Sequence, residues 1–225
     1  MLIHIPGILT PDEVAASRAR LAKAAWVDGR VTAGPQSAKV KENLQLAEDS
    51  ADARELGAVV LRALERSPLF VSAALPRFVY PPMFNRYEPG MGFGAHVDNA
   101  IRQMGPAHRI RTDVSATLFL SPPEDYDGGE LVVEDTYGTH SAKPAAGDLI
   151  LYPATSLHRV MPVTRGMRVA SFFWVQSMVQ EDSERTLLFE LDRAIAELTQ
   201  AAPDSASLVR LTAIYHNLVR KWTAM

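Results

Sequence analysis

The sequence contains no cysteine among its 225 residues. This absence excludes disulfide bonds, zinc fingers, iron–sulfur clusters and thiol catalysis, because each of them needs a cysteine sulfur. Any metal ion must therefore be bound by His, Asp or Glu side chains, and any redox chemistry needs a bound cofactor.

Two further absences narrow the class of protein. The 23 Lys and Arg residues are balanced by 26 Asp and Glu residues, so no basic surplus attracts the chain to nucleic acid or to an anionic membrane. No apolar run reaches the roughly 18 residues that span a bilayer. The first residues also lack the basic region and long apolar stretch of a signal peptide. We therefore expect a cytoplasmic protein that binds neither nucleic acid nor membrane.

The residues that are present suit a folded protein of modest size. Apolar residues make up 47% of the chain, which is enough for a sizeable core. The length fits one domain, or one domain with a small appendage. From the change in sequence pattern along the chain, we predict a domain of residues 1–178 and a helical appendage of residues 179–225.

Residues 1–70 are predicted to be mainly helical. The segment Thr10–Glu13 reads Thr-Pro-Asp-Glu, which has the form of a capping box, and the helix that it starts is expected to run to about Trp26. A second helix is predicted over residues 56–65, where Leu and Val recur at helical spacing. Pro68 and the serine before it are expected to end that helix.

Residues 77–178 have the pattern of short β-strands. Runs rich in β-branched and aromatic residues, separated by Gly and Pro, cover residues 78–80, 83–87, 114–120, 131–134, 149–152, 159–163 and 168–176. This spacing favours an antiparallel sandwich or barrel, and the lack of helices between the runs argues against a doubly wound parallel fold. The pair Gly128-Gly129 is predicted to form a hairpin turn.

The last region returns to a helical pattern. Apolar residues step by three and four positions on both sides of a break at Pro203, namely Leu188, Leu191, Ile195 and Leu198, then Leu208, Leu211, Tyr215, Leu218 and Trp222. The pattern predicts an antiparallel pair of helices, each with one apolar stripe. The stripes could pack on the protein's own core or form a contact between subunits of a homo-oligomer, and the sequence leaves both open.

One of the six histidines stands out because of its neighbours. His96 is followed two positions later by Asp98, and side chains two positions apart on a strand point to the same face. His158, which follows a predicted strand ending at Pro153, is the candidate for a third ligand. Two His and one carboxylate form the facial triad that binds Fe(II) and leaves coordination positions open.

Arg168 lies inside an apolar strand ten residues after His158. Alternation places it on the same face as Phe172 and Trp174. A buried guanidinium cannot lose its charge and needs a partner. An internal carboxylate or the carboxylate of a ligand would supply that partner, and the sequence leaves both open.

The spacing of His96, Asp98, His158 and Arg168 resembles that of the iron(II)/2-oxoglutarate-dependent dioxygenases. The stretches at residues 113–121 and 125–131 resemble the prolyl-4-hydroxylase-like branch of that superfamily. Nearly the whole chain is similar to the bacterial PKHD-type hydroxylases, a group often linked to iron-uptake loci. The resemblance implies an α+β fold with a mainly β core: a double-stranded β-helix (jelly roll) flanked by N-terminal helices and a C-terminal helix pair.

The resemblance also implies the roles of individual residues. His96, Asp98 and His158 would bind Fe(II) and form the catalytic centre. Arg168 would bind the C5 carboxylate of 2-oxoglutarate, and Tyr87 would share that carboxylate. Some relatives have Ser two positions after the Arg, whereas this chain has Ala there, so one polar contact to the cosubstrate would be absent. The enzyme would hydroxylate its substrate with succinate and CO2 as co-products and L-ascorbate as reductant.

The substrate itself is not defined by the sequence, and a small molecule such as a siderophore or a protein side chain would fit. Candidate residues at the rim of the pocket are Asn99, Arg102, Arg109, Arg111 and Tyr126. The segment at 99–111 carries three Arg and one His next to the iron ligands. It could be a solvated loop or a lid that recruits an anionic substrate.

Two other classes of protein could use the same three ligands. One is a non-catalytic metal-binding or sensing jelly roll. The other is a zinc hydrolase in which the metal holds a water molecule. The hydrolase is disfavoured because no Glu follows His96 as a general base and because Arg168 would have no role in it.

Overall fold

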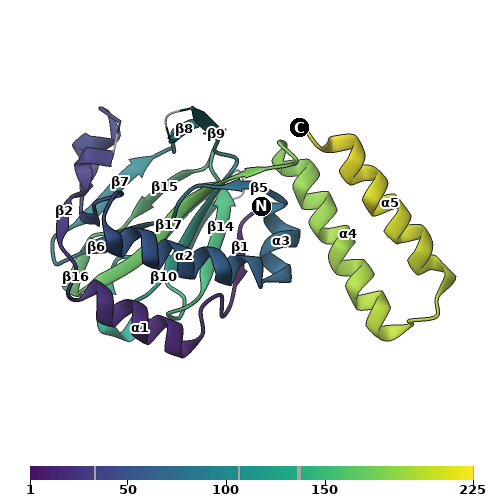
Figure 1. Ribbon diagram of the computed structural model, residues 1–225, viewed down its shortest axis with the longest axis horizontal. Helices are drawn as coiled ribbons and strands as arrows, with labels where there is room; N and C mark the ends of the chain where they lie inside the picture. Colours follow the sequence, from purple (N-terminus) through teal and green to yellow (C-terminus); the bar gives the residue numbers. More distant parts are fainter. Residues whose placement is uncertain (33, 106, 136–137, 225) are drawn as a thin grey trace.

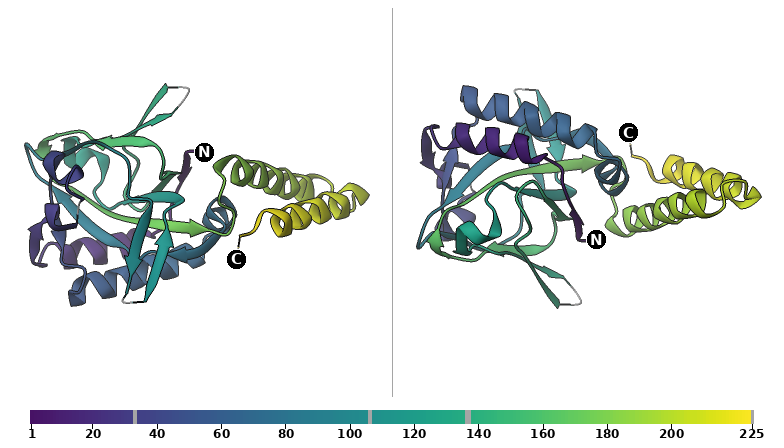
Figure 2. Two further views of the ribbon diagram at one scale, coloured as in Figure 1. Left: turned by 90° about the horizontal axis from the view of Figure 1, so that it is seen from above. Right: turned by 90° about the horizontal axis from the view of Figure 1, so that it is seen from below.

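The computed structural model describes residues 1–32, 34–105, 107–135 and 138–224. Two β-sheets form the core, helices cover the larger sheet, and a helix pair projects from one end of the molecule (Figures 1 and 2). The strand pairings in both sheets are antiparallel. The fold is therefore mixed, with a mainly β core, as the sequence predicts.

The larger sheet carries most of the apolar core. Its strand order is β1-β14-β10-β17-β6-β4-β2, and β5 also pairs with β17. The strands are β1 (Ile3–Ile5), β2 (Trp26–Asp28), β4 (Leu44–Leu46), β5 (Pro76–Val79), β6 (Met83–Tyr87), β10 (Val114–Phe119), β14 (Leu149–Pro153) and β17 (Arg168–Ser177). Every residue of β10 is buried, because this strand lies in the middle of the sheet with both faces covered.

The smaller sheet has the order β13-β12-β15-β7-β3. Its strands are β3 (Lys41–Glu42), β7 (Gly92–His96), β12 (Leu131–Asp135), β13 (Gly138–Ala142) and β15 (Leu157–Val160). Two further strand pairs lie beside the sheets: β8 (Ile101–Met104) with β9 (His108–Arg111), and β11 (Tyr126–Gly128) with β16 (Val163–Gly166). Single turns of 3₁₀ helix are η1 (Gly29–Thr32), η2 (Ser37–Val40) and η3 (Pro123–Asp125).

Three N-terminal helices pack on the larger sheet: α1 (Pro11–Leu21), α2 (Ala51–Glu65) and α3 (Pro68–Ala74). Their apolar residues join those of the sheet in one cluster, which includes Leu21, Leu56, Leu64 and Phe70 from the helices and Phe84, Leu118 and Phe173 from the strands. The capping box at the start of α1 is confirmed, since Thr10 and Glu13 each accept a hydrogen bond from the other's backbone N–H.

The sequence prediction is wrong about the extent of helix in this region. Helix α1 ends at Leu21 rather than near Trp26, because Trp26 begins β2 and pairs with β4. Helix α2 begins at Ala51, five residues earlier than predicted, because the Ser50 side chain caps it. The region also contributes strands to both sheets. In each case a partner distant in the sequence, or a cap outside the apolar pattern, sets the boundary.

Most of the predicted strands are present, and β6 has the predicted bounds. The predicted run at 159–163 divides between β15 and β16. Strands β7, β8, β9 and β13 were missed because they are polar or rich in glycine and lack the apolar alternation that marks a strand.

The Gly128-Gly129 pair does not form a hairpin. It carries the chain from β11, which pairs with β16, to β12 in the smaller sheet. Both glycines have positive φ, and a Cβ on Gly128 would lie 2.1 Å from the carbonyl oxygen of Pro162. Close contact with another backbone segment, rather than a turn between paired strands, requires glycine here.

The C-terminal segment forms the predicted antiparallel pair, α4 (Asp182–Ala201) and α5 (Ala206–Trp222) (Figure 1). The pair meets the rest of the protein along the first half of α4, where Leu188 is buried against Leu75 and Val179 and Asp192 accepts a hydrogen bond from Ser72. Helix α5 has no fully buried residue. Packing on the protein's own core is therefore limited to this end. No helix in the described parts of the chain is both long and apolar enough to cross a membrane.

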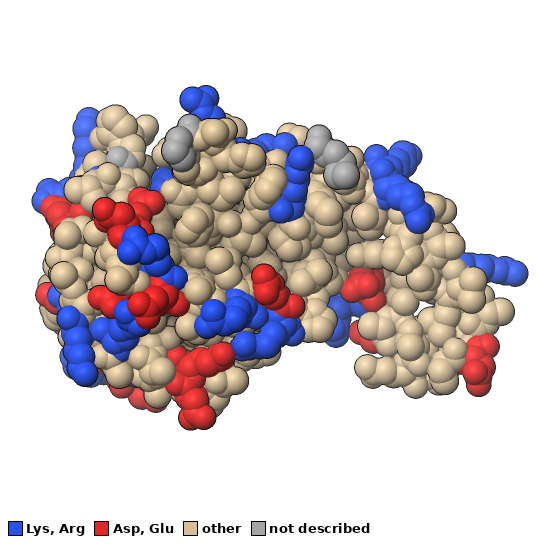
Figure 3. Space-filling view, in the orientation of Figure 1, with Lys and Arg blue, Asp and Glu red and all other residues tan. Residues whose placement is uncertain are grey.

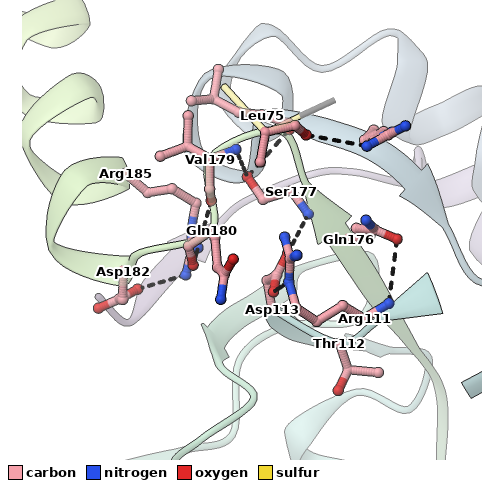
Figure 4. Close-up of polar contacts among 12 residues, drawn as sticks. Leu75, Arg111, Thr112, Asp113, Gln176, Ser177, Val179, Gln180, Asp182 and Arg185 are labelled. Carbon is pink, nitrogen blue, oxygen red and sulfur yellow. Dashed lines mark hydrogen bonds and ion pairs between the residues drawn. The ribbon is translucent and has the colours of Figure 1, made fainter. Parts of the chain in front are cut away.

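A buried arginine secures this junction (Figure 4). Arg185 is 2% exposed and donates hydrogen bonds to the carbonyl oxygens of Val179, at 2.9 Å, and Gln180, at 2.6 Å. It also bonds the Asp182 carboxylate at 3.0 Å. The guanidinium thus satisfies backbone acceptors where the chain turns from β17 into α4.

Replacing this guanidinium by an apolar side chain should weaken the junction. We expect Arg185→Met to lower the free energy of unfolding by about 2–4 kcal/mol, because two carbonyl groups in this junction lose their donor. Urea denaturation followed by circular dichroism would measure the change. Arg193→Met, on the exposed face of the same helix, is the matched control, and equal losses in the two variants would contradict the assigned role.

Candidate metal centre

A cleft opens between the two sheets. Residues of β6, β10 and β17 line it on the side of the larger sheet, and residues of β7, β12 and β15 line it on the side of the smaller one.

The three predicted metal ligands meet in this cleft. His96 ends β7 and lies directly opposite His158 of β15. Asp98 lies two residues beyond the end of the strand, so the expectation that both ligands share one strand is wrong. One ligand atom from each of the three residues lies within 4.8 Å of the others. The Nε2 atom of His158 is 3.7 Å from an Asp98 carboxylate oxygen. Three ligand atoms at these separations can converge on one metal ion.

Hydrogen bonds fix the form in which both imidazoles face the cleft. Nδ1 of His96 lies 2.8 Å from the carbonyl oxygen of Gly94, and Nδ1 of His158 lies 3.1 Å from that of Ser156. A carbonyl oxygen can only accept, so Nδ1 carries the proton in each ring. Each Nε2 therefore presents a lone pair, as a metal ligand must.

Neighbouring side chains orient the Asp98 carboxylate and keep the His96 imidazole neutral. The Ser115 hydroxyl donates to the Asp98 carboxylate at 2.6 Å, which orients the carboxylate. The Phe93 ring stacks on His96 with a centroid separation of 3.6 Å. Burial and the neighbouring His158 lower the pKa of His96 to about 4, so this imidazole is neutral at pH 7.

Arg168 lies in the same cleft without a protein counterion. It is 1% exposed, and none of its three guanidinium nitrogens has a hydrogen-bond partner among the described residues. The side chain lies beside the rings of Tyr87, at 5.2 Å, and Phe119, at 5.0 Å. The internal salt bridge that the sequence left open is therefore absent from the described parts of the chain.

An unpaired buried guanidinium fits a ligand that brings its own carboxylate. Tyr87 lies opposite Arg168 in the pairing of β6 with β17. Burial raises the pKa of Tyr87, so its hydroxyl stays protonated and can donate to the same carboxylate. Gly129 leaves room for the guanidinium, since a Cβ there would lie 3.0 Å from Cδ of Arg168.

Several polar residues of the cleft were missed from the sequence. Ser115 and Thr117 line it from β10, and Asn85 lines it from β6, opposite Ala170. The signal for the first two was present, because two hydroxyl residues at alternate positions of an otherwise apolar strand share one face. Lys41 also lines the cleft, but its short strand carries no apolar pattern that would have predicted this position.

The predicted rim residues divide into two groups. Asn99 and Arg102 line the cleft. Arg109 is exposed and bonds Gln103. Arg111 pairs with the buried Asp113 at 2.6 Å (Figure 4), and neither arginine lines the cleft. The prediction is therefore wrong for these two arginines.

Tyr126 does not lie at the rim either, since it is fully buried. The segment at 99–111 is largely the β8–β9 hairpin in its described part, rather than an irregular loop; residue 106 lies outside the described residues. On the face of the molecule in Figure 3, basic and acidic residues are interspersed over α1 and α2, as the near-neutral charge predicts.

Comparisons with known proteins identify the class. The sequence profile of the 2OG-Fe(II) oxygenase superfamily matches residues 82–176. A crystal structure of a Pseudomonas putida prolyl-4-hydroxylase aligns with a TM-score of 0.53 at 21% identity, over 78% of this chain and 92% of that one. A Trichoplax adhaerens prolyl hydroxylase aligns with a TM-score of 0.57 at 16% identity, over 83% and 86% of the two chains. The core is thus a jelly roll, and the protein is a hydroxylase that uses Fe(II) and 2-oxoglutarate.

The family can be stated more narrowly. The profile of the PKHD-type hydroxylase C-terminal domain matches residues 182–224, which include both C-terminal helices. A PKHD-type hydroxylase of Xanthomonas campestris pv. campestris is 62% identical over 225 residues, which cover 99% of each chain. The chain belongs to the PKHD-type hydroxylases.

Removing one of the three converging side chains should abolish metal binding. We expect His158→Ala to weaken Fe(II) binding by on the order of 100-fold or more, because loss of an outer partner alone typically costs 10–100-fold. Anaerobic titration calorimetry would measure the affinity, and circular dichroism would check the fold. His140→Ala removes an exposed histidine of β13 as the control. Stoichiometric iron in the His158 variant would contradict the assignment.

Proposed function

We propose that this protein hydroxylates an organic substrate in the cleft between its sheets. Fe(II) is bound by His96, Asp98 and His158, and 2-oxoglutarate is anchored by Arg168, so that succinate and CO2 are the co-products. One observation carries the proposal: a buried guanidinium without a partner among the described residues shares a cleft with three converging metal ligands.

The bound iron and the cosubstrate supply the chemistry that activates O2 towards a C–H bond. The protein's own residues position the reactants. The two imidazoles present Nε2 to the metal because their Nδ1 protons are held by backbone carbonyls. Ser115 holds the Asp98 carboxylate, and Phe93 and Tyr152 pack against the imidazoles and limit access of water.

The cosubstrate is held by groups from two neighbouring strands. Arg168 binds the far carboxylate through its fork of N–H donors, and the Tyr87 hydroxyl donates to the same group. Asn85 supplies a polar contact that Ala170 cannot, because the two residues face each other across the pairing of β6 with β17 and the Asn85 side-chain oxygen has no partner among the described residues.

Further parts of the proposal rest on the family resemblance. L-ascorbate serves as the reductant that keeps the iron in the Fe(II) state. The substrate is a small molecule such as a siderophore or a protein side chain, and the Trichoplax prolyl hydroxylase is in complex with a peptide fragment. A role in iron uptake follows from the same resemblance.

We also propose that residues 1–178 form the oxygenase domain and that residues 179–225 form an appendage. No described residue of the appendage lines the cleft, which supports the division. A contact between subunits through the helix pair stays a prediction, which sedimentation of the full chain would check.

The competing function is a metal sensor without catalysis. The two are separated by incubating the protein with Fe(II), ascorbate and 2-oxoglutarate and measuring succinate with and without candidate substrates. An oxygenase forms succinate and consumes 2-oxoglutarate in equal amounts. If the protein neither forms succinate nor binds 2-oxoglutarate in the presence of several candidates, the proposed function is wrong.

Substitution of Arg168 and substitution of a metal ligand should affect the binding of 2-oxoglutarate and of Fe(II) differently. We expect Arg168→Leu to raise the Kd for 2-oxoglutarate by on the order of 100-fold, because a two-pronged charged contact is lost, while Fe(II) binding changes less than about twofold. Calorimetry with each ligand would measure both constants. Arg165→Leu, which removes an exposed arginine of β16, is the control. Equal losses of iron and 2-oxoglutarate in the Arg168 variant would indicate a structural arginine instead.

A further inference from the structure

Two cations other than Arg168 face the cleft. Lys41 is 4% exposed, and its ammonium donates to the hydroxyl of Thr32 at 2.9 Å. The same nitrogen lies 5.3 Å from the ring centroid of Phe93 and 5.9 Å from that of Phe172. A buried ammonium with one neutral hydrogen-bond acceptor and two aromatic neighbours is incompletely compensated.

Arg102 approaches from the β8–β9 hairpin. Its guanidinium lies 4.3 Å from the ring centroid of Trp174 and 5.2 Å from that of Tyr80, and it makes a long contact of 3.9 Å with the sulfur of Met83. In the described parts of the chain, neither Arg102 nor Lys41 forms an ion pair within 4.0 Å of a carboxylate. The carboxylates of Asp98, Glu48 and Asp28 act on the Lys41 ammonium only from a greater distance.

Other cationic side chains of the protein, in contrast, form ion pairs with carboxylates. Arg111 pairs with Asp113, and Arg165 pairs with Asp127. Burial lowers the pKa of Lys41 to about 8, with a smaller contribution from the nearby Arg102. The ammonium is therefore still largely charged at pH 7. Two positive groups that face one cleft would both gain from a bound anion.

The two cations approach the metal cluster from different elements, Lys41 from β3 of the smaller sheet and Arg102 from the separate β8–β9 hairpin. The Phe93 ring that neighbours Lys41 also stacks on His96. On the other side, Trp174, which neighbours Arg102, lies opposite Ser115, the residue that holds Asp98. Phe172 and Trp174 contact each other edge to face at 5.7 Å and form an apolar wall of the cleft.

These groups are distinct from the proposed cosubstrate anchor. Arg168 and Phe172 are four residues apart on β17, which is roughly 13 Å along a strand. A carboxylate bound at Arg168 therefore leaves the positions near Phe172 and Trp174 to another ligand.

We propose, resting on the function proposed above, that Lys41 and Arg102 bind an anionic group of the substrate while Phe172 and Trp174 pack against its apolar body. The substrate is accordingly a small organic acid with a planar or apolar part. Charge-assisted hydrogen bonds fix its orientation, and the aromatic wall contributes contact area.

Fluorinated aromatic probes test this inference without knowledge of the natural substrate. The full chain is loaded with Zn(II), which supports no turnover, and with saturating 2-oxoglutarate, so that Arg168 is occupied. Binding of 4-fluorophenylacetate is followed by fluorine NMR and compared with 4-fluorophenylacetamide, which has the same shape without the charge. We expect the acid to bind about tenfold more tightly than the amide.

Substitutions then locate the charge effect. Lys41→Met and Arg102→Met should each weaken binding of the acid by about fivefold and change binding of the amide by less than about twofold. Lys39→Met, next to the cleft on η2, and Arg109→Met, on the same hairpin as Arg102, remove equal charge from exposed positions and should have no effect. Arg102→Met, on the hairpin, keeps the test open if Lys41→Met fails to fold.

Each outcome decides the matter. Equal binding of acid and amide, equal effects in the control variants, no binding of the acid at its solubility limit, or binding of the acid only when 2-oxoglutarate is left out would overturn the inference. Tighter binding of 4-fluorophenyl phosphate than of the acid, lost in the same two variants, would support the anion site and identify a phosphate monoester as its ligand. If candidate substrates with and without an acid group stimulate succinate formation equally, this inference is wrong and the proposed function stands. If the protein neither binds nor turns over 2-oxoglutarate, the proposed function itself is wrong.

Discussion

The pairing of β7 with β15 is the contact on which the site depends. It places His96 directly opposite His158, two residues that are 62 positions apart in the sequence. A slip of one residue would turn one imidazole to the other face of the sheet and separate the ligands. Glycine makes the pairing close, since a Cβ on Gly92 would lie 3.1 Å from the carbonyl oxygen of Val160. The glycine-rich segment before His96 is thus part of what sets the ligand geometry.

Arg185 and Arg168 are both buried, but their surroundings differ. Arg185 is surrounded by carbonyl oxygens and a carboxylate, and it holds the helix pair to the core. Arg168 is equally buried, but its nitrogens have no acceptor among the described residues. Burial alone would not distinguish them. The difference in acceptors does, because an arginine that stabilises the fold finds its partners within the protein, whereas one that binds a ligand leaves them to the ligand.

The sequence was sufficient for the convergent site and for the helices with strong apolar stripes. His96, Asp98 and His158 were predicted to meet because their types and spacing match a known metal-binding pattern, and the structure brings them together. Helix boundaries near Trp26, the polar strands and the path through Gly128-Gly129 were not predicted, because distant backbone partners determine them. Lys41 was missed for the same reason: only the pairing of β3 with β7 brings it to the cleft.

Gly129 carries a constraint that extends to its neighbour Arg168. Its φ of +68° disfavours any side chain, and a Cβ would press on Cδ of Arg168 and on the Tyr126 ring, each at 3.0 Å. In the function proposed above, a side chain at Gly129 would shift Arg168 and so weaken the binding of the cosubstrate. The position of Arg168 is therefore coupled to the residue at 129 through this packing contact.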